Sequence, residues 1–191
     1  MPVPPRRALD LGSGGGVPGL VLARSWPASC WVLLDAGERR AAFLRSAISE
    51  LDLRDRVAVL EERAETAGRD PALRASFDLV VARSFGLPAV TAECAAGFLA
   101  VGGHLVVSEP PANAEGRWDV AGLARLGLEP VAPSAAADFR VQVFEQTQAC
   151  PDRYPRRSGV PAKRPLWSSV SRETSGRMLD PNQGQRGGSR Q

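Results

Sequence analysis

The sequence predicts an α/β fold with a doubly wound, mostly parallel sheet whose last strand is antiparallel. Two observations predict it. Short apolar runs alternate along the chain with segments of helical periodicity, which is the order expected of βαβ units. The runs are apolar at nearly every position, as in parallel strands that helices cover on both faces.

The first part of the chain supplies three of the expected strands. Arg7–Leu11 is a short apolar run that ends in a glycine-rich loop, and Pro18 suits the first turn of the next helix, where its missing N–H costs little. Cys30–Asp35 is a second apolar strand. Glu38–Leu51 carries apolar residues at helical spacing, and Val57–Leu60 is the third strand.

The middle of the chain continues the alternation. Ser76–Ala82 is the fourth strand, and a helix is expected over about residues 88–99. The fifth strand, His104–Ser108, follows a pair of glycines. A weaker helical pattern covers Val120–Leu126. Because each strand is followed by a helix, the carboxyl ends of the strands, where such sheets bind ligands, lie along one edge.

The last part of the chain changes character. Two strands are expected at residues 128–132 and 139–144, and the second alternates apolar with polar side chains, which favours an antiparallel strand. From Cys150 onward Pro, Arg, Ser, Gly and Gln dominate without a period. We therefore divide the chain into a ligand-binding domain, 1–150, a basic segment, 151–167, and a disordered tail, 168–191.

Composition limits the class of protein. The 191 residues are 43% hydrophobic, enough for the core of one domain. No apolar stretch of eighteen residues and no apolar leader occur, so we expect a cytoplasmic protein without a membrane anchor. We also expect it to act as a monomer. Cys30, Cys94 and Cys150 are far apart, which favours buried structural thiols over a metal site. The single histidine, His104, opens a strand and is expected to be structural, not a general base.

The charge is unevenly distributed. Residues 151–191 carry nine Lys or Arg and three acidic residues, whereas residues 1–150 carry fifteen and eighteen. A mildly acidic domain with a basic extension indicates binding to nucleic acid or another anionic surface. The alternative at this point is a passive, solvated extension.

The glycine-rich loop has the spacing Asp10-x-Gly12-x-Gly14-x-Gly16. It is not a phosphate-binding P-loop, because no Gly-Lys-Ser/Thr follows, and it misses the dinucleotide fingerprint because Val17 stands where the third glycine belongs. The spacing matches the first motif of class I methyltransferases, which bind S-adenosylmethionine. Asp10 would then lie near the ammonium group of the cofactor.

Asp35 ends the second strand, where its carboxylate could accept from both ribose hydroxyls. A nicotinamide cofactor stays open as an alternative, because an acidic residue here serves that cofactor equally well. A merely structural turn between strand and helix is the second alternative.

Five segments together make a more specific resemblance, and they are residues 10–19, 34–45, 63–65, 81–84 and 153–165. The chain resembles, over residues 8 to about 167, the 16S ribosomal RNA (guanine-N7) methyltransferase family, also called glucose-inhibited division protein B. The resemblance implies a Rossmann-like class I methyltransferase fold and methyl transfer from S-adenosylmethionine to N7 of a guanine in the 30S subunit.

The resemblance also implies roles for single residues. Gly12 and Val17 would line the methionine and ribose side of the cofactor, Gly14 would also bind the cofactor, and Ala64 and Glu65 would meet its adenine. Arg83 would lie at the mouth of the site and position cofactor or RNA, unless it only forms a salt bridge at the end of its strand. The residues expected to bind RNA are Arg153, Arg156, Arg157, Lys163 and Arg164.

The expected reaction needs no catalytic side chain. Guanine N7 carries a lone pair in the ring plane and no proton, so positioning replaces general-base catalysis. Two departures from the family pattern are expected to weaken RNA binding: the helical segment that precedes the first strand in the family is not seen before Arg7, and Glu109 stands where a lysine is common. A non-catalytic paralogue that binds cofactor or RNA is the runner-up, and a nicotinamide oxidoreductase is the third hypothesis.

Overall fold

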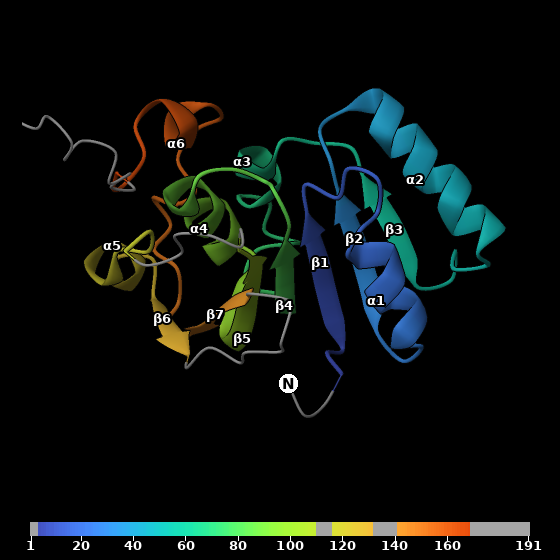
Figure 1. Ribbon diagram of the computed structural model, residues 1–191, viewed down its shortest axis with the longest axis horizontal. Helices are drawn as coiled ribbons and strands as arrows, with labels where there is room; N and C mark the ends of the chain where they lie inside the picture. The colour runs from blue at the N-terminus through green and yellow to red at the C-terminus, as the bar shows by residue number, and fades with distance from the viewer. Residues whose placement is uncertain (1–3, 110–115, 132–140, 169–191) are drawn as a thin grey trace, which may run out of the picture.

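The computed structural model describes residues 4–109, 116–131 and 141–168, which form one seven-stranded sheet flanked by short helices (Figure 1). The strands are β1 (Arg7–Leu11), β2 (Cys30–Leu34), β3 (Val57–Leu60), β4 (Phe77–Ala82), β5 (Leu99–Ser108), β6 (Leu128–Val131) and β7 (Val141–Gln146). The helices are α1 (Gly19–Ser25), α2 (Glu38–Glu50), α3 (Ala64–Ala67), α4 (Pro88–Ala96), α5 (Val120–Ala124) and α6 (Val160–Lys163).

The sheet has the strand order β3-β2-β1-β4-β5-β7-β6. The first five strands are parallel, and β7 pairs antiparallel with both β5 and β6. The chain moves to one side of β1 with β2 and β3 and then to its other side with β4 and β5. The carboxyl ends of β1 and β4 therefore form the switch point of the topology, where open α/β sheets bind ligands.

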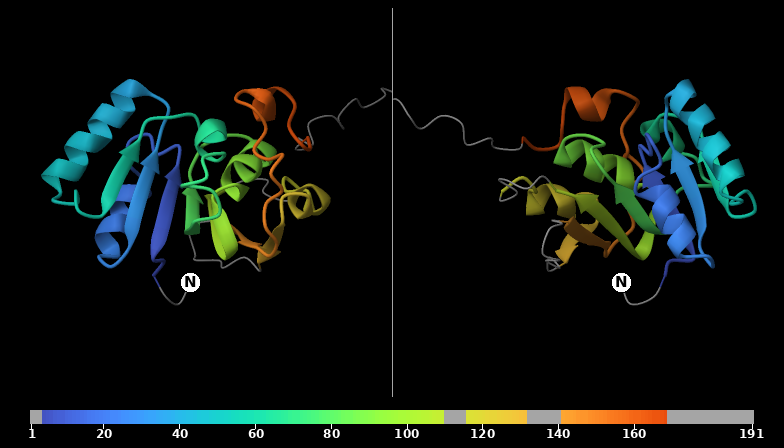
Figure 2. Two further views of the ribbon diagram at one scale, coloured as in Figure 1. Left: turned by 180° about the vertical axis from the view of Figure 1, so that it is seen from behind. Right: turned by 45° about the vertical axis from the view of Figure 1, so that its right-hand side comes forward.

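Helices cover both faces of the sheet, as predicted. On one face, Leu20 of α1 and Leu44 of α2 pack in a core cluster with Ala8 of β1. On the other, Ala92 of α4 packs in a second cluster with Leu9 of β1. Neighbouring residues of one strand thus point into opposite clusters, as the pleat requires. The helices α3, α4 and α6 gather beside the carboxyl end of β4 (Figure 2).

The predicted strands are confirmed, with β5 as the main correction. It begins at Leu99, five residues before the predicted start, because Leu99 already pairs with Phe77 of β4. The predicted helix 88–99 accordingly ends at Ala96. The first residues of the predicted strand 139–144 lie outside the described residues, and β7 extends to Gln146. The antiparallel pairing of β7 is confirmed.

The segment that follows β7 packs against the core of the domain. Tyr154 is 3% exposed within the core cluster, and Leu166 and Trp167 pack against the same cluster. The guanidinium of Arg74 donates to the carbonyl oxygens of Tyr154 (2.8 Å) and Cys150 (2.7 Å). These contacts make residues 150–168 an integral part of the domain. The predicted disordered tail lies outside the described residues, apart from Ser168.

The structure partly corrects the prediction that all three cysteines are buried. Cys94 is buried in α4 and Cys150 is half-buried, but Cys30 is exposed because it is the first residue of β2, at the edge of the packed layers. All three are free thiols. His104 is half-buried within β5. In the described part of the chain, no helix is long and apolar enough to cross a membrane.

Candidate functional site

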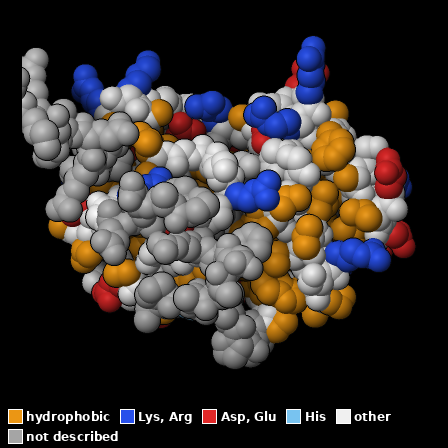
Figure 3. Space-filling view, viewed as in Figure 1, with side chains coloured by type: hydrophobic (Ala, Val, Ile, Leu, Met, Phe, Trp, Pro, Cys, Tyr) orange, Lys and Arg blue, Asp and Glu red, His pale blue; other side chains and the backbone are white. Residues whose placement is uncertain are grey.

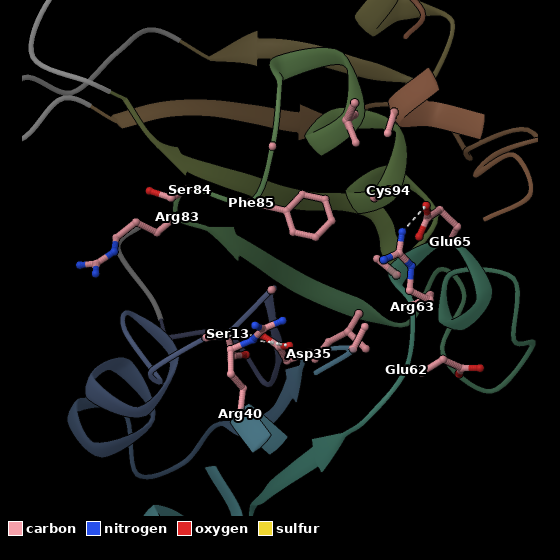
Figure 4. Close-up of a pocket in the computed structure, with 18 of the residues that line it drawn as sticks. Ser13, Asp35, Arg40, Glu62, Arg63, Glu65, Arg83, Ser84, Phe85 and Cys94 are labelled. Atoms are coloured by element: carbon pink, nitrogen blue, oxygen red, sulfur yellow. Dashed lines mark hydrogen bonds and ion pairs between the residues drawn. The ribbon is translucent and has the colours of Figure 1, made fainter. Parts of the chain in front are cut away.

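A cavity of about 620 Å³ opens at the carboxyl edge of the sheet (Figure 4). Its walls come from the loop after β1, the end of β2, the start of α3, the segment after β4 and α6. The predicted cofactor residues that line it are Gly12, Gly14, Val17, Asp35, Ala64, Glu65 and Arg83. Residues from four separate segments, predicted from separate sequence motifs, therefore share one cavity.

The loop between β1 and α1 depends on glycine. Gly12 has φ +71°, and a Cβ on it would lie 2.6 Å from the ring of Phe85. Gly16 has φ +85°, and a Cβ there would collide with the side chain of Leu20. Both positions require a left-handed backbone and lack space for a side chain. The N–H of Gly12 donates to the carbonyl oxygen of Leu34 (2.9 Å), which fixes the loop against the end of β2.

Asp35 lies on the cavity wall with its carboxylate already hydrogen-bonded. One oxygen accepts from the N–H of Gly14 (2.9 Å), and the other accepts from the N–H of Gly37 (2.8 Å) and from Nε of Arg40 (2.8 Å). Burial opposes the charge, but these donors outweigh it and hold the pKa of Asp35 below its ordinary value. The residue is a fixed anion that ties the glycine loop to the end of β2.

Asp10 is not among the residues that line the cavity. It is 1% exposed, and its carboxylate accepts from the N–H of Gly19 (3.0 Å) at the start of α1. Burial raises its pKa to about 6, although the bond from Gly19 opposes the shift. The carboxylate lies behind the loop, where it fastens α1 to β1, and its predicted place near the ammonium group of the cofactor stays a prediction.

Glu65, at the start of α3, is 5% exposed and faces the cavity. Its Oε1 accepts from the N–H of Gly159 (2.9 Å) and lies 3.6 Å from Nη2 of Arg63 (Figure 4). Arg63 itself is largely exposed, which agrees with a surface contact more than with a catalytic role. Glu65 therefore joins the cavity to the C-terminal part of the chain.

Arg83 follows β4 directly and is exposed at the mouth of the cavity. It forms no salt bridge with any described residue, so the alternative of a strand-end ion pair finds no support in the described residues. Figure 4 shows its guanidinium pointing away from Glu65. The ring of Phe85, two residues after Arg83, lines the cavity between Arg83 and Glu65. No sequence pattern singled out Phe85, because its role comes from its contact with Gly12.

Glu109 does not present the free negative charge on which the expected weakening of RNA binding depends. Its side chain is only 2% exposed, and Arg117 pairs with one of its oxygens. Nε1 of Trp118 donates to the other (2.6 Å). Glu109, with its charge paired to Arg117, lines a second cavity of about 90 Å³. This cavity shares Ser84, Phe85 and Gly86 with the first. Glu109 thus presents no free negative charge at the mouth of the site.

The five predicted RNA-binding residues fall into two groups. Arg153, Arg157, Lys163 and Arg164 are exposed. Figure 3 shows Lys and Arg side chains projecting from the upper edge of the molecule, where the parallel strands end. Arg156 differs, because Nε and Nη2 of its guanidinium are bound by the buried carboxylate of Glu93. We therefore assign Arg156 a structural place instead of the predicted RNA contact.

The cavity offers neither a reactive thiol nor a metal cluster. Cys94 lines it, but burial raises the pKa of this thiol, with Glu65 and Glu93 adding to the shift, so it stays protonated at neutral pH. No group of three or more His, Cys, Asp or Glu residues in the described ranges could hold a metal ion. The site therefore provides a shaped cavity with the fixed carboxylates of Asp35 and Glu65 at its two ends and backbone groups between them.

Sequence comparison identifies close relatives. A family model described as rRNA small subunit methyltransferase G matches residues 3–110. The chain is 37% identical over 171 residues to a ribosomal RNA small subunit methyltransferase G of Prochlorococcus marinus, an alignment that covers 86% of this chain and 69% of the relative. It is also 37% identical over 170 residues to the protein of that name from Rubrobacter xylanophilus, covering 84% and 65%.

Solved structures share the fold. A sarcosine dimethylglycine methyltransferase from Galdieria sulphuraria matches with a TM-score of 0.60 and 11% identity, over 74% of this chain and 78% of that one. A 16S rRNA N2 methyltransferase of T. thermophilus, solved with AdoMet and guanosine, matches with a TM-score of 0.55 and 22% identity, over 76% and 36%. At these identities the likeness establishes the class I methyltransferase fold alone.

The raised pKa of Asp10 predicts a pH-dependent stability. The carboxyl titrates near 3.8 in the unfolded chain and near 6 in the native state, so the native state binds more protons between these values. Stability is therefore lost as the pH rises from about 4 to about 6. Asp10→Asn keeps an acceptor for Gly19 and carries no charge. Between pH 4 and pH 7 we expect the variant to gain roughly 2–3 kcal/mol of unfolding free energy relative to wild type. Urea titrations at several pH values measure it, and a constant difference between the two proteins would contradict the assignment.

Proposed function

The chain belongs to the rRNA small subunit methyltransferase G family, and we propose that it transfers a methyl group from S-adenosylmethionine to N7 of a guanine in 16S rRNA. The observation that supports this best is the shared cavity. Residues predicted from four separate motifs to hold this cofactor line the same space at the switch point of the sheet.

The residues present fit this cofactor. A cavity of about 620 Å³ lies in the range of small-molecule sites. Asp35 offers carboxylate oxygens to the ribose hydroxyls, and Ala64 and Glu65 lie where we place the adenine. Gly12 and Val17 border the methionine side, where a loop without bulky side chains allows close approach. The cofactor, when bound, supplies an activated methyl group.

The chemistry that remains for the protein is positioning. Guanine N7 has no proton to remove, so the site needs no general base, and neither the protonated thiol of Cys94 nor the hydrogen-bonded Asp35 is suited to act as one. Arg83 stands exposed at the mouth, where a guanidinium can hold an RNA phosphate. We place the target base near Phe85, between the two cavities.

We place the RNA on the exposed basic residues of the C-terminal segment. Arg153, Arg157, Lys163 and Arg164 are exposed, and Lys163 belongs to α6, whose Ala162 lines the cavity. Cations beside a cofactor cavity suit the phosphate backbone of 16S rRNA within the 30S subunit. Family membership favours methyl transfer over the nicotinamide hypothesis. The paired state of Glu109 removes one of the two reasons for expecting a non-catalytic paralogue.

Transfer of labelled methyl from S-adenosylmethionine to unmethylated 30S particles tests the function. We expect incorporation at one guanine, with chain cleavage there after borohydride and aniline treatment, which is selective for N7-methylguanine. Incorporation at another atom of the base would overturn the N7 assignment. Binding of the cofactor without any transfer to 30S particles or free 16S rRNA would favour the non-catalytic paralogue.

Asp35→Ala tests the cofactor site. We expect it to weaken binding of S-adenosylhomocysteine by about 1.5–3 kcal/mol, the scale of lost hydrogen bonds to a charged group. Asp78→Ala is the matched control. Its carboxylate also accepts from two backbone N–H groups, those of Arg6 and Arg7 at 2.9 Å, but it does not line the cavity. Calorimetric titration measures both, and equal affinities for wild type and Asp35→Ala would refute the placement.

The basic residues predict a salt-dependent RNA affinity. Removing the whole segment would also remove Tyr154 and Trp167 from the core, so single charges must be changed instead. The triple substitution Arg157→Gln, Lys163→Gln and Arg164→Gln should lower the slope of log affinity against log salt by about two, because each phosphate that the protein no longer neutralises lowers it by about 0.7.

A control triple with the same change of charge uses other exposed arginines, namely Arg24→Gln, Arg39→Gln and Arg54→Gln. Filter binding of a 16S rRNA fragment at several salt concentrations compares the two triples. Equal reductions of the slope in both would mean that the RNA senses only the net charge of the protein, and that the C-terminal segment is no specific contact surface.

A further inference from the structure

Glu93 of α4 carries a fully buried carboxylate, with 0% exposure, whose described partner is one residue of the C-terminal segment. Its Oε1 accepts from the backbone N–H (2.8 Å) and from Nε (2.8 Å) of Arg156, and its Oε2 accepts from Nη2 (2.6 Å). A buried charge is tolerated only with good geometry and full hydrogen bonding. This bidentate ion pair therefore fixes Arg156 rigidly on α4.

Arg156 also closes a loop in its own segment. Its Nη2 donates to the carbonyl oxygen of Arg164 (2.8 Å), so both ends of the stretch 156–164 are tied to one guanidinium. Within this stretch Gly159 has φ +78°, and Ala162 lines the cavity. The loop is thus held as a unit against the cavity wall.

The middle of the loop reaches the cavity through one hydrogen bond. The N–H of Gly159 donates to Oε1 of Glu65 at 2.9 Å. Within the described residues, Oε2 of Glu65 has no hydrogen-bond partner. One oxygen of this buried carboxylate is therefore held by the loop, which leaves the other as an acceptor for a ligand.

We propose that the loop 156–164 sets the orientation of Glu65 and thereby the recognition of the cofactor's adenine, with Arg156 and Gly159 as positioning residues. This inference rests on the proposed function. Adenine presents a 6-amino donor, whereas hypoxanthine presents an acceptor oxygen at the same position. A fixed carboxylate oxygen distinguishes the two, because it gains a hydrogen bond from the first and meets an acceptor in the second. A mobile carboxylate turns away and distinguishes them poorly.

Arg156→Lys tests the proposal, because a lysine keeps the charge but cannot hold both oxygens of Glu93 and the carbonyl of Arg164 together. The probes are S-adenosylhomocysteine and S-inosylhomocysteine, titrated by calorimetry. We expect wild type to bind the adenosyl compound about tenfold more tightly or better. In the variant this ratio falls to about threefold or less, while affinity for the inosyl compound stays within about twofold.

Arg45→Lys is the matched control. Arg45 pairs with Glu61 at 2.8 Å on the surface, and neither residue lines the cavity. Its ratio of affinities should equal that of wild type. Gly159→Ala is the second variant and decides the matter if Arg156→Lys does not fold. A Cβ there has open space, but an alanine resists φ +78° and displaces the donor to Glu65.

The two proposals fail in different ways. If wild type binds neither compound, the cofactor assignment falls and this inference falls with it. If wild type discriminates and the folded variants keep the same ratio, only the positioning role is overturned. The positioning role is also overturned if the variants bind both compounds more weakly by the same factor. Such a result indicates general destabilisation and not loss of an oriented acceptor.

Discussion

The site depends on a loop that must pass close to the end of β2 and to Phe85 at the same time. Its backbone meets this constraint only with positive φ at glycines 12, 14 and 16 and with no side chain at Gly12. In this conformation the N–H of Gly12 donates to the carbonyl oxygen of Leu34, and the N–H of Gly14 donates to the carboxylate of Asp35. The loop thus orders the end of β2, and the anion of Asp35 in turn holds the loop.

The two aspartates near this loop show how one residue type serves opposite needs. Asp35 has three donors and remains ionised on the cavity wall. Asp10 has the single backbone donor Gly19 in nearly complete burial, and its pKa rises to about 6. Asp35 is suited to bind a polar ligand, whereas Asp10, whose pKa is raised, joins β1 rigidly to α1. The difference arises first from burial, which raises the pKa of Asp10, and then from the larger number of donors that hold the pKa of Asp35 low.

Prediction from sequence was most accurate where a short local pattern specifies the structure. Short, mostly apolar runs placed β1 and β3 correctly, and glycine spacing placed the cavity loop, because both follow from local backbone requirements. The helices α3 and α6 were missed, since four residues are too few to show a period. The states of Glu109 and Arg156 were also beyond prediction. Each depends on a partner that the fold supplies, and charge alone does not tell a paired ion from a free one.

The long separation between Glu93 and Arg156 has a consequence for the newly made chain. During synthesis α4 is complete 60 or so residues before its cation emerges, so the helix must wait with an uncompensated carboxylate on the side that will be buried. Until then the carboxylate lacks the partner that compensates its burial in the finished domain. A chain that ends before residue 156 lacks both this cation and Ala162, which lines the cavity. A cell that makes an incomplete copy makes one in which the adenine end of the site lacks its supporting wall.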